Sequence, residues 1–163
     1  MTGDSGGMPR DALDRSSATF ALLGGTLIVA GGLVAAVNSA APFAHGSWLA
    51  AYLVLVAGTS QVLLGVGRRA LLLREPPRRL TRAQLLIWNT GSAAVPGGVL
   101  GGAALPVTAG SVALLAALAC FAAGVRGVPR RAGAVAYHAL IVALAASVIV
   151  GSAMAGAAPG QWL

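Results

Sequence analysis

Residues 68–82 read RRALLLREPPRRLTR, and this stretch separates two of the long apolar parts of the chain. Pro76 and Pro77 near its centre cannot donate backbone hydrogen bonds and prevent a single helix from running through it. Its six basic residues are Arg68, Arg69, Arg74, Arg78, Arg79 and Arg82. A basic, helix-breaking segment between apolar segments is typical of a loop that joins two membrane-spanning helices.

The other arginines form two further clusters, which alternate with connections that contain no basic residue. One cluster precedes the first apolar segment (Arg10 and Arg15), and the other follows the fourth (Arg126, Arg130 and Arg131). No Lys or Arg occurs in 38–47, in 105–108 or from residue 156 onward. Because basic loops are retained in the cytoplasm, this alternation predicts five crossings, with the N-terminus cytoplasmic and the C-terminus outside.

The composition excludes a soluble globular protein. Of the 163 residues, 57% are hydrophobic and only 9% are charged. We therefore expect an all-α, polytopic integral protein of the cell membrane. The net charge of +7 does not indicate a nucleic-acid partner, because the basic residues are confined to loops. All 11 basic residues are arginines, and the absence of lysine from an Ala- and Gly-rich chain indicates a GC-rich bacterial genome.

Five segments have the length of about 20 residues that a helix needs to cross a bilayer core of about 30 Å. They are 18–38, 47–67, 82–104, 108–126 and 132–155. We expect a mobile cytoplasmic tail over 1–17, an arginine-rich cytoplasmic loop over 68–81 and a short outer tail over 156–163. The first segment is expected to remain uncleaved, because its apolar run is longer than that of a signal peptide. Thr81 and Gln84 have the spacing of a capping box, so we expect the third helix to begin near Arg82.

Small residues recur at helical spacing in three of the predicted helices. Because lipid tails are as apolar as leucine, membrane helices associate through close packing, and small residues mark the contacts. Gly97 and Gly98 each precede another glycine by four residues, and the first helix has the pairs 24–25 and 31–32. The last helix has a stripe of Ala139, Ala143, Ser147, Gly151 and Ala155. These patterns predict a tightly packed bundle, with gaps that admit a ligand as the alternative.

Four predicted helices carry a distinctive side chain at a common depth. At about 1.5 Å per residue from the cytoplasmic helix ends, these side chains lie about 9 Å inside the inner boundary of the membrane. This polar layer consists of Gln61, Trp88, Asn89, Cys120 and His138. Polar side chains in membrane helices commonly form hydrogen bonds to a neighbouring helix. An ionisable group at this depth is also a functional hypothesis by default, so both interpretations stay open.

We expect no catalytic residues and no metal site. Nucleophilic and general acid–base catalysis need a positioned base, and no Asp or Glu lies in a predicted span. His45 precedes the second helix on the outer side, whereas His138 lies near the inner side, so bonds of about 2 Å cannot join both to one metal. We therefore expect no cofactor. Haem is an alternative only on one histidine alone or at a site shared between two copies of the chain.

The arginine-rich loop is expected to orient the protein in the membrane. Each arginine near an anionic leaflet is worth about 1 kcal/mol, so the loop can also hold lipid headgroups or dock an acidic partner. We expect a small non-enzymatic membrane protein, a scaffold or accessory subunit that packs through Gly- and Ala-rich helix faces. Its partners would be membrane lipid and either a second copy or another membrane protein. The alternative is a small-solute transporter or haem-binding membrane protein that uses the polar layer around His138.

Overall fold

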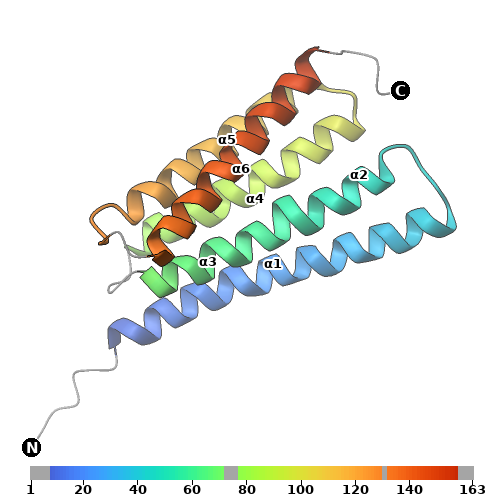
Figure 1. Cartoon of the computed structure of the whole chain (residues 1–163). Helices are drawn as coiled ribbons and strands as arrows, with labels where there is room; N and C mark the ends of the chain where they lie inside the picture. Colours follow the sequence, from blue (N-terminus) through green and yellow to red (C-terminus); the bar gives the residue numbers. More distant parts are fainter. Residues whose placement is uncertain (1–7, 72–76, 130–131, 158–163) are drawn as a thin grey trace, which may run out of the picture.

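The computed structural model describes residues 8–71, 77–129 and 132–157. Over these residues the chain is helical and contains no strand (Figure 1). The elements are α1 (Met8–Ala40), α2 (Gly46–Ala51), the π-helix η1 (Tyr52–Thr59), α3 (Ser60–Leu71), α4 (Arg78–Leu100), α5 (Ala104–Gly124) and α6 (Ala132–Ala157).

The helices form five rods that alternate in direction. α2, η1 and α3 follow one another without a break and make a single rod. The start of α1, the end of α3, the start of α4 and the end of α5 consequently lie at one end of the molecule (Figure 1). We call this the arginine-rich end, because it carries Arg15, Arg68, Arg69, Arg78, Arg79, Arg82 and Arg126. Arg74, Arg130 and Arg131 lie outside the described residues.

Four helical segments in the described part of the chain are long and apolar enough to cross a membrane. They are Arg15–Ala40, Gly46–Leu71, Ala104–Gly124 and Ala132–Ala153. The fifth rod, α4, has the length for a crossing, at 23 residues, but it is less apolar than the other four. It begins with Arg78 and Arg79 and carries several polar side chains further along. The described part of the chain is therefore all-helical, with four apolar helices and one more polar helix.

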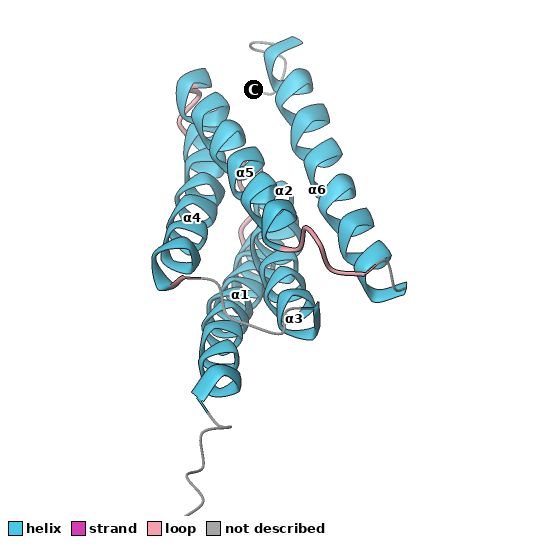
Figure 2. Ribbon diagram, turned by 90° about the vertical axis from the view of Figure 1, so that its left-hand side faces the viewer, coloured by secondary structure: helices cyan, strands magenta, loops and turns pink. Residues whose placement is uncertain are grey.

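The core lies where α1, α3, α4, α5 and α6 meet. α5 lies between α4 and α6, and the α2–α3 rod packs against α1 (Figure 2). Phe121 of α5 joins these layers through two edge-to-face ring contacts. Its ring centroid is 5.7 Å from that of Phe20 on α1 and 6.4 Å from that of Trp88 on α4. All three rings are buried, and edge-to-face pairs of this kind contribute about 0.5–1.5 kcal/mol beyond their buried area.

Glycines allow the closest helix approaches, but only some of the predicted ones take part. A Cβ atom built on Gly24 would lie 2.7 Å from the Gly58 carbonyl oxygen, where α1 meets the second rod. At the crossing of α4 and α5, a Cβ on Gly91 would lie 2.9 Å from the Gly110 carbonyl oxygen. By contrast, a Cβ on Gly97 would meet nothing within 4 Å. Of the predicted Gly-x-x-x-Gly pairs of α4, Gly98 does approach α5, since a Cβ on it would lie 2.8 Å from the Val107 backbone nitrogen.

The small-residue stripe of α6 does not pack against the described part of the chain, although the sequence predicts it as a contact of a tightly packed bundle. Ala139, Ala143, Ser147 and Gly151 are exposed, and the side chain of Ala155 is outside the described part. The inward face of α6 consists of Ala134, Tyr137 and Ile141. Tyr137 explains this orientation, because its ring packs on Gly67 and its hydroxyl donates a 3.3 Å hydrogen bond to the Leu64 carbonyl oxygen.

Several helix ends differ from the predicted ones. The predicted tail over 1–17 is helical from Met8 onward, because Pro9 in the first turn lacks only an N–H that a helix leaves unused. The predicted loop over 68–81 is shorter, since α3 continues to Leu71 and α4 begins at Arg78. Pro77, not Thr81, is the N-cap of α4, so the predicted capping box is wrong. Residues 156–157 of the predicted outer tail belong to α6, and the rest of that tail is not described.

The π-helix η1 was not predicted and changes how the second rod presents its side chains. A π-helix places hydrogen bonds between residues five apart and occurs often at functional sites. Ser60 follows η1, and its hydroxyl contacts the carbonyl oxygens of Leu55 at 2.7 Å and Val56 at 2.6 Å. Tyr52, Ala57 and Gly58 of η1 are buried. Tyr52 and Gly58 thus lie on the side of η1 that faces the rest of the bundle.

Candidate functional site

The structure does not gather the whole predicted polar layer into one place. Gln61 and Trp88 are fully buried in the bundle, whereas Asn89 and Cys120 are partly exposed. Asn89 donates a 2.8 Å hydrogen bond to the Leu85 carbonyl oxygen of its own helix. His138 is exposed on the outer surface of α6. Two members of the layer therefore face the interior, and the histidine faces away from it.

The imidazole of His138 is held by its own helix. Its Nδ1 atom lies 2.7 Å from the Ala134 carbonyl oxygen, so Nδ1 carries the hydrogen in this contact. The Nε2 atom of a neutral ring is then an acceptor that points away from the helix backbone. A ligand of His138 would consequently approach from outside this single chain.

Arg68 occupies the interior instead of the surface that the sequence predicts for it. Only 5% of the residue is exposed. Its Nη1 donates a 2.7 Å hydrogen bond to the Gln84 Oε1, and its Nη2 donates a 2.9 Å bond to the Thr81 Oγ1. Thr81 and Gln84 act together, but they hold the guanidinium group from α3 instead of capping α4. This pair of bonds joins the second rod to α4 at the arginine-rich end.

Arg68 is buried because of its position around the axis of α3. Gln61, Leu64 and Arg68 are separated by three and four residues, so they share one face of α3, and all three are buried. On α4, a spacing of four residues places Gln84, Trp88 and Ser92 on one buried face. Between these two faces lies a seam that the Arg68 side chain bridges and that contains several buried polar side chains.

Several polar atoms in this seam have no hydrogen-bond partner among the described residues. They are the Tyr52 hydroxyl, both Oε1 and Nε2 of Gln61, the Trp88 Nε1 and the Ser92 hydroxyl. The Tyr52 and Ser92 side chains lie close enough to interact, but their geometry does not complete a hydrogen bond. Leaving a buried polar group without a partner costs about 1–3 kcal/mol. The seam therefore holds hydrogen-bonding groups that the described part of the chain does not use.

The pairings at the two ends of the seam place Gln61 and Trp88 in its middle. Arg68 meets Thr81 and Gln84 at one end, and Tyr52 approaches Ser92 at the other. Gln61 lies between Tyr52 and Arg68 on the second rod, about 10 Å of helix rise from Arg68. Trp88 lies between Gln84 and Ser92 on α4. We call this set of side chains the polar seam: Tyr52, Gln61, Arg68, Thr81, Gln84, Trp88 and Ser92.

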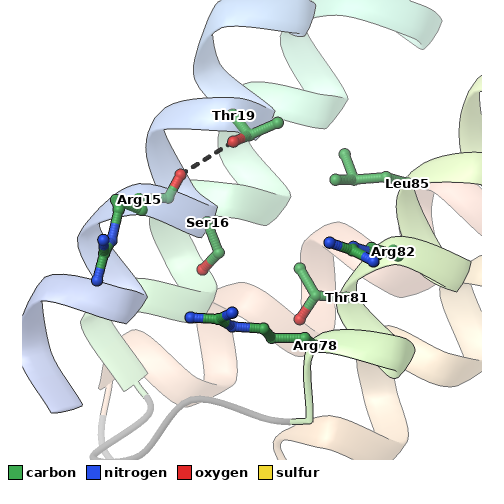
Figure 3. Close-up of a pocket in the computed structure, with 7 residues that line it drawn as sticks. All are labelled: Arg15, Ser16, Thr19, Arg78, Thr81, Arg82 and Leu85. Carbon is green, nitrogen blue, oxygen red and sulfur yellow. Dashed lines mark hydrogen bonds between the residues drawn. The ribbon is translucent and has the colours of Figure 1, made fainter. Parts of the chain in front are cut away.

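A second polar feature opens at the arginine-rich end, between α1 and α4. It is a pocket of about 240 Å³ lined by Arg15, Ser16, Thr19, Arg78, Thr81, Arg82 and Leu85 (Figure 3). Arg78 and Arg82 extend from α4 toward α1, and the Thr81 hydroxyl points into the space between them. Thr81 belongs to both features, because it lines the pocket and accepts the hydrogen bond from Arg68. We call this the arginine pocket.

The two features differ in the chemical groups that they offer. Within the described residues, no group of three His, Cys, Asp or Glu side chains is close enough to hold a metal ion. The polar seam offers amide, indole and hydroxyl groups, and the arginine pocket offers guanidinium groups. The burial of Arg68 and the position of Arg15 near Arg78 were not predicted. A signal for the first was present, since Arg68 continues the inward helical phase of Gln61 and Leu64.

No protein-family model matches this chain, and neither the curated proteins nor the solved structures contain a match. The fold and the placement of its polar residues are therefore the basis on which a function can be proposed.

Proposed function

We propose that this chain is a small, non-enzymatic membrane subunit that assembles with further helices in a bacterial cell membrane. In this proposal all five rods cross the bilayer, with the N-terminus and the arginine-rich end in the cytoplasm and the C-terminus outside. The gathering of the described arginines at one end supports this orientation, because basic residues near membrane spans are retained on the cytoplasmic side.

The observation that carries the proposal is the outer surface of α1 and α6. In the most apolar stretch of each of these two helices, only 17% is buried. The corresponding share is 44% for the second rod and 39% for α5. The α6 surface carries Ala139, Ala143, Ser147 and Gly151, and the outer surface of α1 carries Gly25 and Gly32. A Cβ on Gly25, Gly32 or Gly151 would meet nothing within 4 Å.

These small residues allow a close approach that a single chain does not use. The first helix shows the contrast directly, because Gly24 and Gly31 pack against the second rod while Gly25 and Gly32 do not. Lipid fills the surface beside large side chains well, whereas small residues let the backbone of another helix come near. A second copy or a different membrane protein would bury them.

The assembly of α6 can be tested by enlarging its small residues. We expect the unaltered chain to elute in mild detergent with the mass of an oligomer or of a complex with a partner. Ala143→Leu should shift it toward the monomer without loss of helical content. Val142→Leu is the matched control, because Val142 is exposed one residue further round the same helix. A chain that is monomeric in detergent and in cross-linked membranes would contradict the proposal.

The polar seam favours a second candidate function, transport of a small polar solute. The unpartnered atoms of Gln61, Trp88, Ser92 and Tyr52 would bind a solute or a file of water molecules that passes between the second rod and α4. Uptake into proteoliposomes tests this function, with Gln61→Leu expected to abolish uptake. Without uptake of water, ions or small polar solutes, the candidate fails.

The visible absorption spectrum of the purified chain tests the haem alternative separately. His138 faces outward, so a haem on it would lie outside the bundle or between two copies. An absorbance band that disappears in His138→Ala would support this alternative, and a colourless preparation would remove it.

A further inference from the structure

We propose that the arginine pocket binds the phosphate group of an anionic membrane lipid. The two helices that form it approach from opposite sides. α1 supplies Arg15, Ser16 and Thr19, and α4 supplies Arg78, Thr81, Arg82 and Leu85 (Figure 3). The pocket thus brings together arginines from two clusters that are more than sixty residues apart in the sequence.

The first step concerns charge. Arg78 and Arg82 are four residues apart on α4, so their like charges repel one another by about 0.2–0.5 kcal/mol. Both extend into the same space, toward the α1 helix that carries Arg15. A phosphate between them would remove this repulsion. Guanidinium groups bind phosphate oxygens through paired, charge-assisted hydrogen bonds, which are stronger than bonds between neutral groups.

The second step concerns Thr81, a buried hydroxyl at the wall of the pocket. Thr81 is only 6% exposed, and its Oγ1 accepts a hydrogen bond from Arg68. A hydroxyl group that accepts one hydrogen bond still has its own hydrogen to donate. No acceptor for that hydrogen occurs among the described side-chain bonds, and the hydroxyl points toward the pocket in Figure 3. Arg68 therefore orients Thr81 as a donor to an oxygen atom bound in the pocket.

The third step concerns the position of the pocket relative to the apolar spans. Arg15 is the first residue of the α1 span, so the pocket lies where the apolar part of the bundle begins. Leu85 forms its apolar wall. One turn beyond Thr19, α1 exposes Leu22 and Leu23. A lipid phosphate in the pocket would place its acyl chains along these leucines, whereas a soluble phosphate compound would leave them uncovered. The surroundings therefore favour a lipid.

The size of the pocket agrees with this ligand. Its volume is about 240 Å³. This is room for a phosphate group and the glycerol carbons next to it, with the acyl chains outside. The exposed leucines at the apolar side and the arginines at the polar side match the two ends of such a molecule.

The test is a titration of the full chain in uncharged detergent with short-chain phosphatidylglycerol and, separately, phosphatidylcholine. Native mass spectrometry measures the bound fraction. We expect tighter binding of phosphatidylglycerol. Since each arginine is worth about 1 kcal/mol toward an anionic headgroup, the double variant Arg78→Gln/Arg82→Gln should bind it about 30-fold more weakly. Thr19→Phe fills the pocket without a change of charge and should also weaken binding.

Arg79→Gln is the matched control, because Arg79 is exposed on the same turn of α4 but does not line the pocket. It should change the affinity less than twofold. An equal loss in Arg79→Gln would overturn the proposal in favour of general surface charge. Equal binding of the two lipids by the unaltered chain would also overturn it. Displacement of the lipid by the same concentration of inorganic phosphate or glycerol 3-phosphate would assign the pocket to a soluble compound instead.

Discussion

Arg68 shows how a single side chain can connect a membrane bundle at its polar end. An arginine at the end of an apolar run normally extends toward water. Its helical phase, however, places it on the inward face with Gln61 and Leu64. The side chains of Thr81 and Gln84 supply acceptors at the matching level of α4. Its planar, forked guanidinium group can reach both acceptors at once.

Replacing Arg68 by lysine tests this geometry while keeping the charge. A lysine ammonium group cannot match the fork, so one buried acceptor on α4 would lose its donor. We expect Arg68→Lys to destabilise the fold by about 1–3 kcal/mol, measured by unfolding in mixed micelles. The exposed control Arg79→Lys should stay within about 0.5 kcal/mol of the unaltered chain. Equal stability of the two variants would mean that Arg68 contributes nothing through its fork.

Gln61 differs from Arg68, because its buried amide group has no hydrogen-bond partner among the described residues. Replacing an unsatisfied buried polar group by an apolar group of similar size is close to neutral or stabilising. We therefore expect Gln61→Leu to retain or increase stability by up to about 2 kcal/mol. Gln84→Leu should instead destabilise the fold, because it removes an acceptor from Arg68. A marked loss of stability in Gln61→Leu would show that the amide has a structural partner.

At the scale of helices, the crossing of α4 and α5 depends on the lack of side chains at Gly91 and Gly110. A Cβ on either glycine would lie 2.9 Å from the carbonyl oxygen of the other, and backbone atoms cannot rotate away. Gly91→Ala should therefore force the helices apart and cost about 1–3 kcal/mol. Gly97→Ala on the same helix meets nothing within 4 Å, so it should be neutral or slightly stabilising through helix propensity. Thermal unfolding followed by circular dichroism compares the two variants, and equal midpoints would contradict this account.

The helices themselves followed from the sequence more readily than their faces did. Length, hydropathy and the prolines at 76 and 77 place four of the described spans close to their predicted bounds. Small residues identified the helices that approach one another, but not the direction in which each stripe points. On α6, the bulk of Tyr137 against Gly67 decides the inward face, and the Ala139–Ala143 side turns outward. Which face of a helix turns inward depends on the residues of the neighbouring helix, and the periodicity of one helix does not reveal them.

The candidate site was predictable to the same partial extent. Depth along the helix axis follows from counting residues, and it placed Gln61 and Trp88 in the same part of the bundle. Rotation about the axis does not follow from that count, so His138 was grouped with them although it faces outward. The arginine pocket required knowledge of which helices are neighbours, because Arg15 and Arg78 come together only through packing of α1 beside α4. Pairwise neighbours are a property of the whole molecule.

At the scale of the whole molecule, α4 decides the topology. The other four rods are apolar enough to cross a membrane alone, whereas α4 carries Gln84, Asn89 and Ser92 along its length. These side chains face the seam or the helix backbone, so packing against the second rod and α5 would shield them from lipid. A helix of this kind can cross as part of a bundle, because its polar groups face protein rather than hydrocarbon.

A reporter enzyme that is active only outside the cytoplasm tests whether α4 crosses. If all five rods cross, a fusion after residue 163 should be active, and a fusion between α3 and α4 should be inactive. If α4 lay on the cytoplasmic surface, the two remaining helices would return the C-terminus to the cytoplasm, and both fusions would be inactive. Deleting Arg126, Arg130 and Arg131 from the same fusions tests whether these arginines set the orientation, because basic residues next to spans are retained in the cytoplasm. If the fusion between α3 and α4 is active in the unaltered chain, the orientation is the inverse of the proposed one, and the arginine pocket lies at the outer leaflet.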